Sequence, residues 1–394
     1  MRITDVEPIS LIVERSKEAV ERPGSPVSMP YAEEVKEVVF GRYQTTVVKV
    51  HTDEGVTGIG ECISRLAPTA TRDIVETIKP VLLGRDPRDV EVIWEMLYGI
   101  MMNRGHNKGF YVEAISGIDI ALWDAMAKYE GVPLYKLLGG LHNNPLECYA
   151  SSIFMKEDLE SSLEEARGYV EAGYDSLKVK IGEDPEQDIE LVWAVRDTVG
   201  SDVRIMVDAN CGYDVTTALR VGKKLEEADV YWFEEPLTPD NLDGYRRLSD
   251  KLSVPIAAGE TEFTRWGFRD LITKGGIGIV QPNVARTGGV TECKKIAALA
   301  SAYHVPYAPH TGTSSLVCLA ASLQLSAYLP NFLIYEYMRA DWDEEGNPLR
   351  TQLAQESFED FRNGYLYVPD KPGIGMELNE EVVERYRVQA PAGV

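Results

Sequence analysis

Cysteine is scarce in this chain. Five cysteines occur in 394 residues, they are scattered, and no two of them form a CxxC pair. This pattern fits reduced thiols and excludes both a disulfide framework and a cysteine-based zinc site. The five are Cys62, Cys148, Cys211, Cys293 and Cys318.

Long apolar runs are also absent. No run approaches the roughly 18 apolar residues that a membrane-spanning helix needs. The first ten residues, MRITDVEPIS, lack the apolar segment of a signal peptide. We therefore expect a cytoplasmic protein that has no membrane partner.

Basic residues are outnumbered by acidic ones. The chain has 40 Lys and Arg against 63 Asp and Glu, which gives a net charge of −23. Nucleic acid and anionic membranes need a basic surface, so neither is an expected partner. High solubility explains the acidic balance most simply, and a saline or hot habitat is the alternative explanation.

The chain does contain one regular pattern of polar residues. Seven chemically reactive residues each end a short apolar run, and consecutive members are separated by 23 to 28 residues. This spacing fits one strand plus one helix per unit. Parallel strands joined by helices close into a (β/α)8 barrel, in which the C-terminal ends of all strands meet at one mouth. The residues that should share this mouth are Lys180, Asp208, Glu234, Glu260, Asn283, His310 and Glu336.

The predicted fold class is α/β, with a modified (β/α)8 barrel over residues 146–364 and an α+β domain over residues 1–145. The tail, 365–394, is expected to fold back on the first domain. Strands followed by helices are typical of an α+β domain, and continuous apolar runs are typical of buried parallel strands. The eight expected barrel strands are Cys148–Phe154, Ser176–Ile181, Arg204–Asp208, Val230–Glu234, Pro255–Glu260, Ile277–Gln281, Val305–His310 and Phe332–Tyr337.

Within the first domain, alternation predicts strands at Thr45–His51 and Val56–Glu61, and an apolar face predicts a helix over Ala114–Tyr129. The segment Ser16–Pro30 is rich in proline and charge. It is either an exposed loop or a lid over an active site.

Three carboxylates end neighbouring barrel strands: Asp208, Glu234 and Glu260. Unpaired, they would repel one another strongly at one mouth. A hard divalent cation removes this cost, and ligands that are all oxygen favour Mg²⁺ over zinc. We therefore predict one Mg²⁺ at these three residues.

Two lysines share one face of the second strand because Lys178 and Lys180 are two residues apart. Close to a metal and a second ammonium group, Lys180 would bind its proton less tightly and could act as a general base. Snorkelling to solvent is the alternative for both lysines.

Three further residues are expected at the mouth. His310 ends the seventh strand, roughly opposite the second, and could supply an acid or a base from the other side of a substrate. Glu336, if buried and protonated, could donate a hydrogen bond to an oxyanion, although a plain salt bridge is the alternative. Asn210 is a neutral hydrogen-bonding group close to the metal ligands.

Together these residues resemble the enolase superfamily, in particular its mandelate racemase branch. The similarity covers essentially the whole chain, and its motifs are specific as a set although each is weak alone. They are Ser116–Asp124, Lys178-Val179-Lys180, Val207-Asp208-Ala209-Asn210, Phe233-Glu234-Glu235-Pro236, Ala258-Gly259-Glu260, Pro309-His310 and Tyr335-Glu336-Tyr337.

The resemblance implies a capping first domain and a Mg²⁺-dependent enzyme that removes the proton α to a substrate carboxylate. It implies Lys180 as the base, Lys178 as its electrostatic neighbour and Glu336 as the group that stabilises the enediolate. Lys178, Glu336 and Asn210 are the expected substrate contacts. It also implies a homo-oligomer, and a lid over the site near Ser16–Pro30.

One residue departs from the family pattern. The family usually pairs the histidine with an aspartate at the end of the sixth strand, whereas this chain has Asn283 there. A neutral amide can orient His310 but cannot raise its pKa as a carboxylate would. This argues against a racemase with two bases, whereas donation of a proton by His310 to a leaving group stays possible.

The predicted reaction is dehydration of a sugar acid, an aldonate or aldarate, to a 2-keto-3-deoxy acid. Cycloisomerisation of an aldonolactone or aldarolactone is one alternative, because the segments 93–98 and 347–374 resemble members with that activity. A racemase or epimerase of a 2-hydroxy acid is another. A non-catalytic binding protein would be a different class, and the intact lysine pair and carboxylate triad argue against it.

Overall fold

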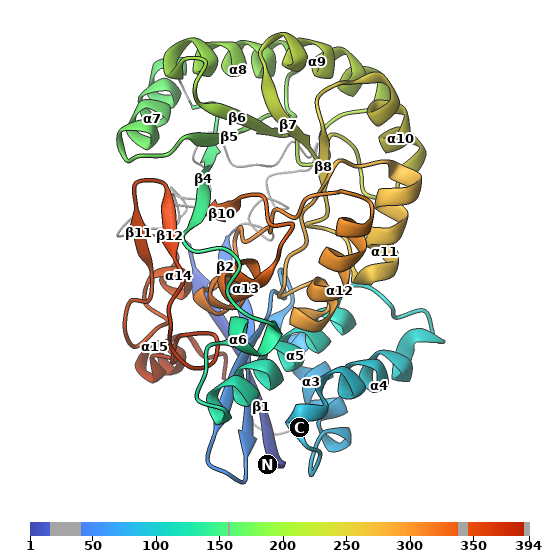
Figure 1. Ribbon diagram of the computed structural model, residues 1–394, viewed down its shortest axis with the longest axis vertical. Helices are drawn as coiled ribbons and strands as arrows, with labels where there is room; N and C mark the ends of the chain where they lie inside the picture. The colour runs from blue at the N-terminus through green and yellow to red at the C-terminus, as the bar shows by residue number, and fades with distance from the viewer. Residues whose placement is uncertain (16–40, 157, 338–345, 390–394) are drawn as a thin grey trace.

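A ring of parallel strands and a three-stranded antiparallel sheet, each with its own helices, make up the computed structural model (Figure 1). The structure describes residues 1–15, 41–156, 158–337 and 346–389. The segment Ser16–Pro30, for which a loop or lid is expected, lies outside the described residues. None of the helices within the described ranges has both the length and the apolarity to cross a bilayer.

The antiparallel sheet comes first in the chain. Its strands are β1 (Ile3–Glu14), β2 (Arg42–Thr52) and β3 (Thr57–Cys62), in that spatial order. The last two correspond to the strands expected from alternation. The sequence pattern did not indicate β1, because polar residues and a proline interrupt its apolar positions.

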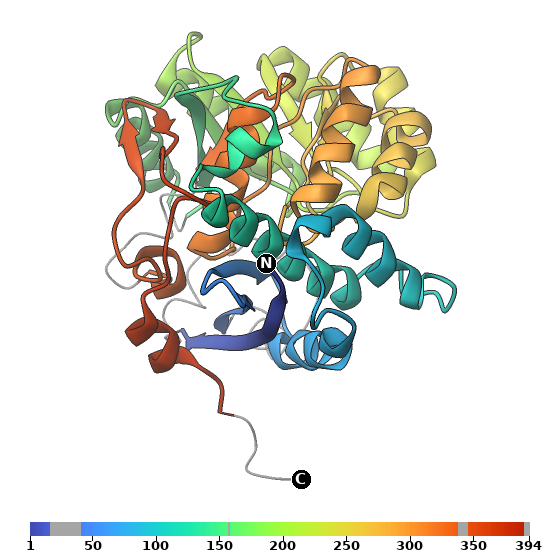
Figure 2. The same cartoon turned by 60° about the horizontal axis from the view of Figure 1, so that its bottom comes forward.

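Helices separate this sheet from the barrel. The longest, α5 (Phe110–Tyr129), lies between the sheet and the barrel helix α12 (Gly289–Ala302), as Figure 2 shows. It packs very closely on β3, since a Cβ added at Gly60 would lie only 2.0 Å from the carbonyl oxygen of Gly117. Close packing on both sides explains why α5 is buried nearly all round. The other helices in the described residues of this part are α3 (Pro68–Ile78), α4 (Val90–Met102) and α6 (Leu134–Leu138), with short 3₁₀ turns at Lys79–Val81 and Pro87–Asp89.

The barrel strands follow one another around a ring in chain order, and the last of them pairs with the first to close it. Inward side chains form a separate apolar cluster with one member from each position of the ring except β5. The strands are β4 (Leu146–Ile153), β5 (Ser176–Lys180), β6 (Arg204–Asp208), β7 (Val230–Glu234), β8 (Ile256–Ala258), β9 (Ile279–Val280) and β10 (Tyr335–Tyr337). The cluster contains Tyr149, Met206, Trp232, Ala257, Ile279, Ala308 and Ile334.

The prediction of a modified (β/α)8 barrel joined to an α+β domain is confirmed, but the predicted seventh strand is wrong. At Val305–His310 the chain forms only an isolated bridge, in which Tyr307 pairs with Val280 on one side and Phe332 on the other. Pro306 and Pro309 flank the bridge, and proline has no N–H to donate to a ladder. The ring therefore still closes here, by a single residue.

The outer helices form an arc around the strands (Figure 1). Asp214 begins one of them by accepting hydrogen bonds from the backbone N–H groups of Thr216 and Thr217, as a capping aspartate does. The helices are α7 (Leu159–Glu171), α8 (Pro185–Val199), α9 (Val215–Glu227), α10 (Leu242–Lys251), α11 (Thr264–Asp270), a π turn at Leu271–Gly275, α12, and α13 (Leu316–Tyr328).

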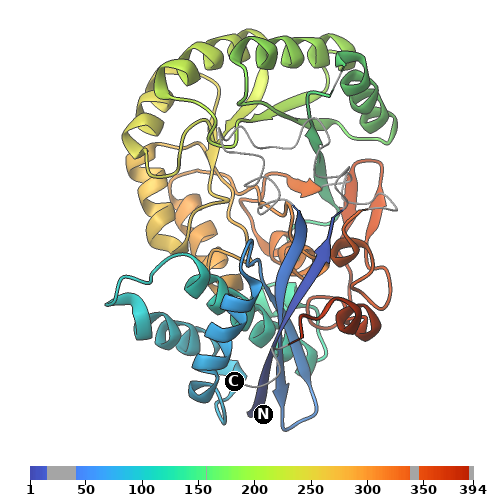
Figure 3. The ribbon, with the colours of Figure 1, turned by 180° about the vertical axis from the view of Figure 1, so that it is seen from behind.

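The end of the chain touches both parts of the molecule. After α14 (Pro348–Thr351), the hairpin of β11 (Asp360–Arg362) and β12 (Tyr365–Tyr367) pairs with β4 of the barrel. The helix α15 (Glu380–Tyr386) lies beside the antiparallel sheet, as Figure 3 shows. After it, Arg387 bridges to Leu11 of β1. The boundaries at residues 145 and 365 stay predictions.

Candidate active site

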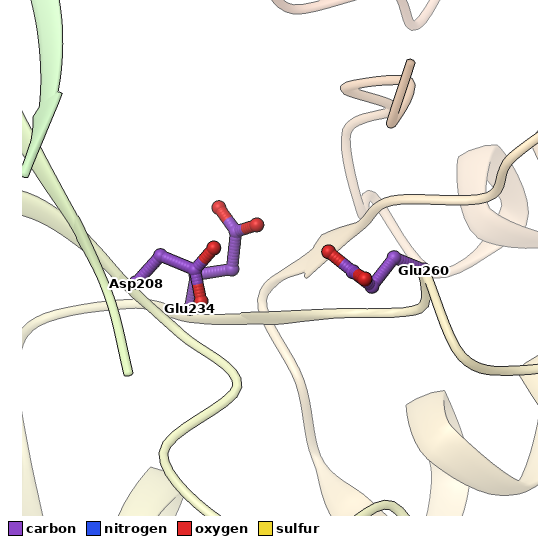
Figure 4. Close-up of side chains that lie close together, drawn as sticks. All are labelled: Asp208, Glu234 and Glu260. Carbon is purple, nitrogen blue, oxygen red and sulfur yellow. The ribbon is translucent and has the colours of Figure 1, made fainter. Parts of the chain in front are cut away.

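Three carboxylates converge at the C-terminal ends of the barrel strands. Asp208 and Glu234 are the last residues of β6 and β7 and lie in register, and Glu260 follows β8 by two residues. One oxygen from each lies within 4.8 Å of the others, and all three side chains are buried. Figure 4 shows their carboxylate groups turned toward a common space.

Electrostatics make this arrangement costly without a cation. The pKa of Glu234 is raised to about 8 because the side chain is buried and the charge of Asp208 lies beside it. A divalent cation would offset this repulsion, and the donor set of three carboxylates suits a hard metal ion. The residues present therefore fit a metal site.

Lys178 is locked among carboxylates. Its Nζ lies 3.0 Å from Glu234 Oε1 and 2.8 Å from Glu336 Oε1, and the side chain is buried. Burial alone would lower its pKa, but the negative charges of Glu234 and Glu336 outweigh this and hold the pKa well above the usual value. Lys178 therefore stays charged, which suits an electrostatic role better than that of a base.

Lys180 lies two residues beyond Lys178 on β5, nearer the mouth. Its Nζ donates to Asp208 and, at 2.8 Å, to Asn210 Oδ1. Its side chain keeps 14% exposure, against 1% for Lys178. The outer lysine of the pair is therefore the more accessible to a bound molecule.

His310 lies beside the third carboxylate. Its Nε2 is 3.1 Å from Glu260 Oε2, and its Nδ1 is 3.0 Å from Asn283 Nδ2. Asn283 lies three residues beyond β9 and is fully buried. The structure thus places the predicted asparagine–histidine pair at the same mouth as the carboxylates.

Glu336 is held by hydrogen-bond donors only. Its Oε2 accepts from the backbone N–H groups of Thr311 and Gly312 at 2.7 and 3.0 Å, and its Oε1 accepts from Lys178 and from Ser151 Oγ. Burial would raise its pKa, but Lys178 and the other donors lower it below the usual value. These contacts favour an ionised Glu336 paired with Lys178, the salt bridge given above as the alternative, over a protonated Glu336 that donates a hydrogen bond.

Two residues of the first domain also reach this region, and sequence reasoning missed both. Arg65 Nη1 lies 3.7 Å from Glu260 Oε1, and Nη2 donates to the carbonyl oxygen of Gly312 at 3.1 Å. Glu61, fully buried, accepts hydrogen bonds from the N–H groups of Ser315 and Cys318 at the start of α13. An acidic residue inside the apolar run of β3 was the available signal for Glu61, whereas Arg65 lies in a loop without a pattern.

Family models match both parts of the chain. Residues 24–139 match the mandelate racemase/muconate lactonizing enzyme N-terminal domain, and residues 161–382 match the enolase C-terminal domain-like family.

Individual relatives cover nearly the whole chain. It is 35% identical to a D-galactarolactone cycloisomerase of Agrobacterium fabrum, over 89% of this chain and 93% of that protein. It is 37% identical to an arabinonate dehydratase of Saccharolobus solfataricus, over 88% and 91%. Among solved structures, a 3,6-anhydro-D-galactonate cycloisomerase from Zobellia galactanivorans superimposes with a TM-score of 0.84 at 31% identity, over 99% and 100% of the two chains.

Proposed function

Because the chain belongs to the mandelate racemase/muconate lactonizing enzyme family of the enolase superfamily, we propose that it dehydrates a sugar acid. The substrate is an aldonate or aldarate, and the product is a 2-keto-3-deoxy acid. The similarity to an arabinonate dehydratase over nearly the full length of both chains supports this reaction.

A metal ion would be held by Asp208, Glu234 and Glu260, and we propose Mg²⁺, one per site, because all three ligands are carboxylates. When bound, the ion supplies positive charge that makes the proton α to a carboxylate more acidic. Enzymes of this superfamily depend on a metal, and the buried triad agrees with that dependence.

Lys180 would remove the proton. The α C–H bond breaks, its proton moves to Lys180 Nζ, and its electron pair enters the enediolate. The C–O bond to the β-hydroxyl then breaks, the hydroxyl leaves with a proton as water, and the enol becomes the ketone. Lys178 stays charged and would stabilise the enediolate, the ionised Glu336 would hold Lys178 in place, and Asn210 would orient Lys180.

One observation carries this proposal. The more exposed lysine of the pair contacts the same carboxylate, Asp208, that forms part of the buried triad. A base and a charge-stabilising centre are thus adjacent, which is what abstraction of a weakly acidic C–H proton needs.

Cycloisomerisation of an aldarolactone or aldonolactone is the second candidate. It begins with the same proton abstraction. In an aldarolactone, the group expelled from the carbon β to the free carboxylate is the lactone ring oxygen, which departs as a carboxylate and needs no proton. Similarity to a D-galactarolactone cycloisomerase supports it. The replacement of the usual aspartate by Asn283 supports it as well, since it weakens His310 as a proton carrier.

A substrate screen tests the proposal. Mono- and diacid sugars and their lactones are incubated with the protein and Mg²⁺, and 2-keto acids are trapped with semicarbazide. Dehydration gives a keto product from an open-chain acid, cycloisomerisation gives one only from a lactone, and epimerisation gives deuterium uptake without a keto product. A Lys180→Ala variant with full turnover would refute the assignment of the base.

The state of the cysteines bears on the compartment. All five cysteines are free, and four of them are buried. This supports a reducing compartment, and we propose the cytoplasm. A homo-oligomer is proposed on family membership alone, and the partner is a small carboxylate rather than nucleic acid or a membrane.

A further inference from the structure

The backbone fixes which way the amide oxygen and nitrogen of Asn283 point. The backbone N–H of Ala285 donates to Asn283 Oδ1 at 2.9 Å, and Cys318 Sγ lies 3.6 Å from the same oxygen. A backbone N–H can only donate, so the amide oxygen must face it. Turning the amide over would place its NH₂ against this N–H in a site with no exposure to solvent.

The amide nitrogen therefore faces two acceptors. Asn283 Nδ2 lies 3.1 Å from Ser314 Oγ and 3.0 Å from His310 Nδ1. An amide nitrogen carries two hydrogens, one for each of these contacts. His310 Nδ1 must consequently accept, which means that it carries no hydrogen.

The other ring nitrogen must then carry the ring hydrogen, because an imidazole carries at least one N–H. Nε2 faces the mouth, 3.1 Å from Glu260 Oε2. The lone pair that a base would need is turned away from the mouth, toward Asn283.

We propose that Asn283 is a positioning residue that holds His310 as a hydrogen-bond donor at Nε2, so that proton abstraction occurs only from the side of Lys180. This inference rests on the proposed function and deepens it. The α-proton moves to Lys180 Nζ and, in dehydration, the same amine returns a proton to the departing hydroxyl. His310 gives a hydrogen bond to a substrate oxygen and exchanges no proton. The substrate is accordingly a sugar acid of one α-configuration.

Substitution by aspartate reverses the polarity of this contact. A carboxylate at position 283 would accept from His310 Nδ1, and the ring hydrogen would move there. The lone pair would then lie on Nε2, facing the mouth. Asn283→Asp is thus nearly isosteric, yet we expect it to make His310 a second base.

Histidine NMR tests the assignment directly. The full chain is labelled with ¹⁵N-histidine and studied with Mg²⁺ bound, by correlations that report which ring nitrogen carries hydrogen. The chain has only five histidines, and His310→Gln identifies the signal by its loss. His304→Gln, at an exposed position, is the matched control and should leave the His310 signal unchanged.

The expected result for the wild type is hydrogen on Nε2 and none on Nδ1. Hydrogen on Nδ1 in the wild type, whatever the state of Nε2, would overturn the proposal, and this result needs no variant to fold. In Asn283→Asp the hydrogen should appear on Nδ1, and an unchanged ring in that variant would also refute the role of Asn283.

A second readout uses exchange in D₂O. Wild type should incorporate deuterium at the α-carbon of one epimer only. Asn283→Asp should exchange the opposite epimer about 10²-fold faster than wild type, the lower end of the contribution of a positioned base. Equal exchange of both epimers by wild type would contradict the inference. Failure of every sugar acid to react would refute the proposed function alone, because the NMR result does not depend on turnover.

Discussion

Metal binding should stabilise the fold measurably, because the triad brings three buried carboxylates within 4.8 Å of one another. The perturbation is exhaustive chelation followed by titration with Mg²⁺. At a free ion concentration of 100 times Kd, binding to the folded state alone adds about 2.7 kcal/mol. For 394 residues, the entropy of unfolding is about 0.8 kcal/mol per kelvin, so Tm should rise by about 3 °C.

The size of this shift should depend on pH in a defined direction. The pKa of Glu234 is raised to about 8, so below that pH the ion must displace a proton from a ligand. Affinity should therefore be about 50-fold weaker at pH 6 than at pH 8, since about half of Glu234 is ionised at pH 8 and about 1% at pH 6. At a fixed ion concentration the rise in Tm should shrink accordingly.

Differential scanning calorimetry at pH 6 and pH 8 measures both effects. Asp208→Asn should abolish the Mg²⁺-dependent shift, whereas Asp202→Asn, at an exposed position, should leave it intact. An equal shift in the Asp208 variant would place the ion elsewhere. A shift that grows as the pH falls would refute the argument from the raised pKa of Glu234.

Three further changes test other parts of the structure. Lys180→Ala should lower kcat about 10³-fold by removing the base. The rates of α-deuterium exchange and of keto-product formation measure this, and the surface variant Lys223→Ala should retain wild-type rates. Glu61→Gln should lower the free energy of unfolding by about 2–4 kcal/mol, because a charged acceptor for the start of α13 is lost. Urea titration measures this loss. A loss no larger than that of the exposed Glu54→Gln would contradict the prediction. Burial raises the pKa of Asp119 to about 7, so its contribution to stability is lost as the pH rises through 7. Relative to Asp119→Asn, the wild type should therefore lose about 3 kcal/mol of unfolding free energy between pH 5 and pH 8. Urea titrations that give the same difference between the two proteins at both pH values would refute this.

The sequence indicated the barrel and most of its mouth because those features are local and periodic. A buried parallel strand is a short apolar run, and a residue that ends it must face the mouth whatever the rest of the molecule does. The lysine pair two residues apart and the acidic residues at the ends of β6 and β7 follow this rule. The seventh strand failed the rule because two prolines within an apolar run limit pairing to a single bridge.

Contacts between distant segments were decided only by the tertiary structure. The sequence alone could name Glu336 as a site residue, but its ionised state depends on donors from Lys178, Thr311 and Gly312. Arg65 and Glu61 join the site because α5 holds β3 against the barrel, which no local pattern encodes.

Residue type along the chain thus determined which chemistry is present: a carboxylate triad, a lysine pair and an asparagine where the family usually has an aspartate. The direction of each hydrogen bond was decided in three dimensions. Whether His310 can accept a proton at the mouth depends on a backbone N–H, that of Ala285, which orients the amide of Asn283. Such polarity is a property of neighbours in space, and folding is what makes them neighbours.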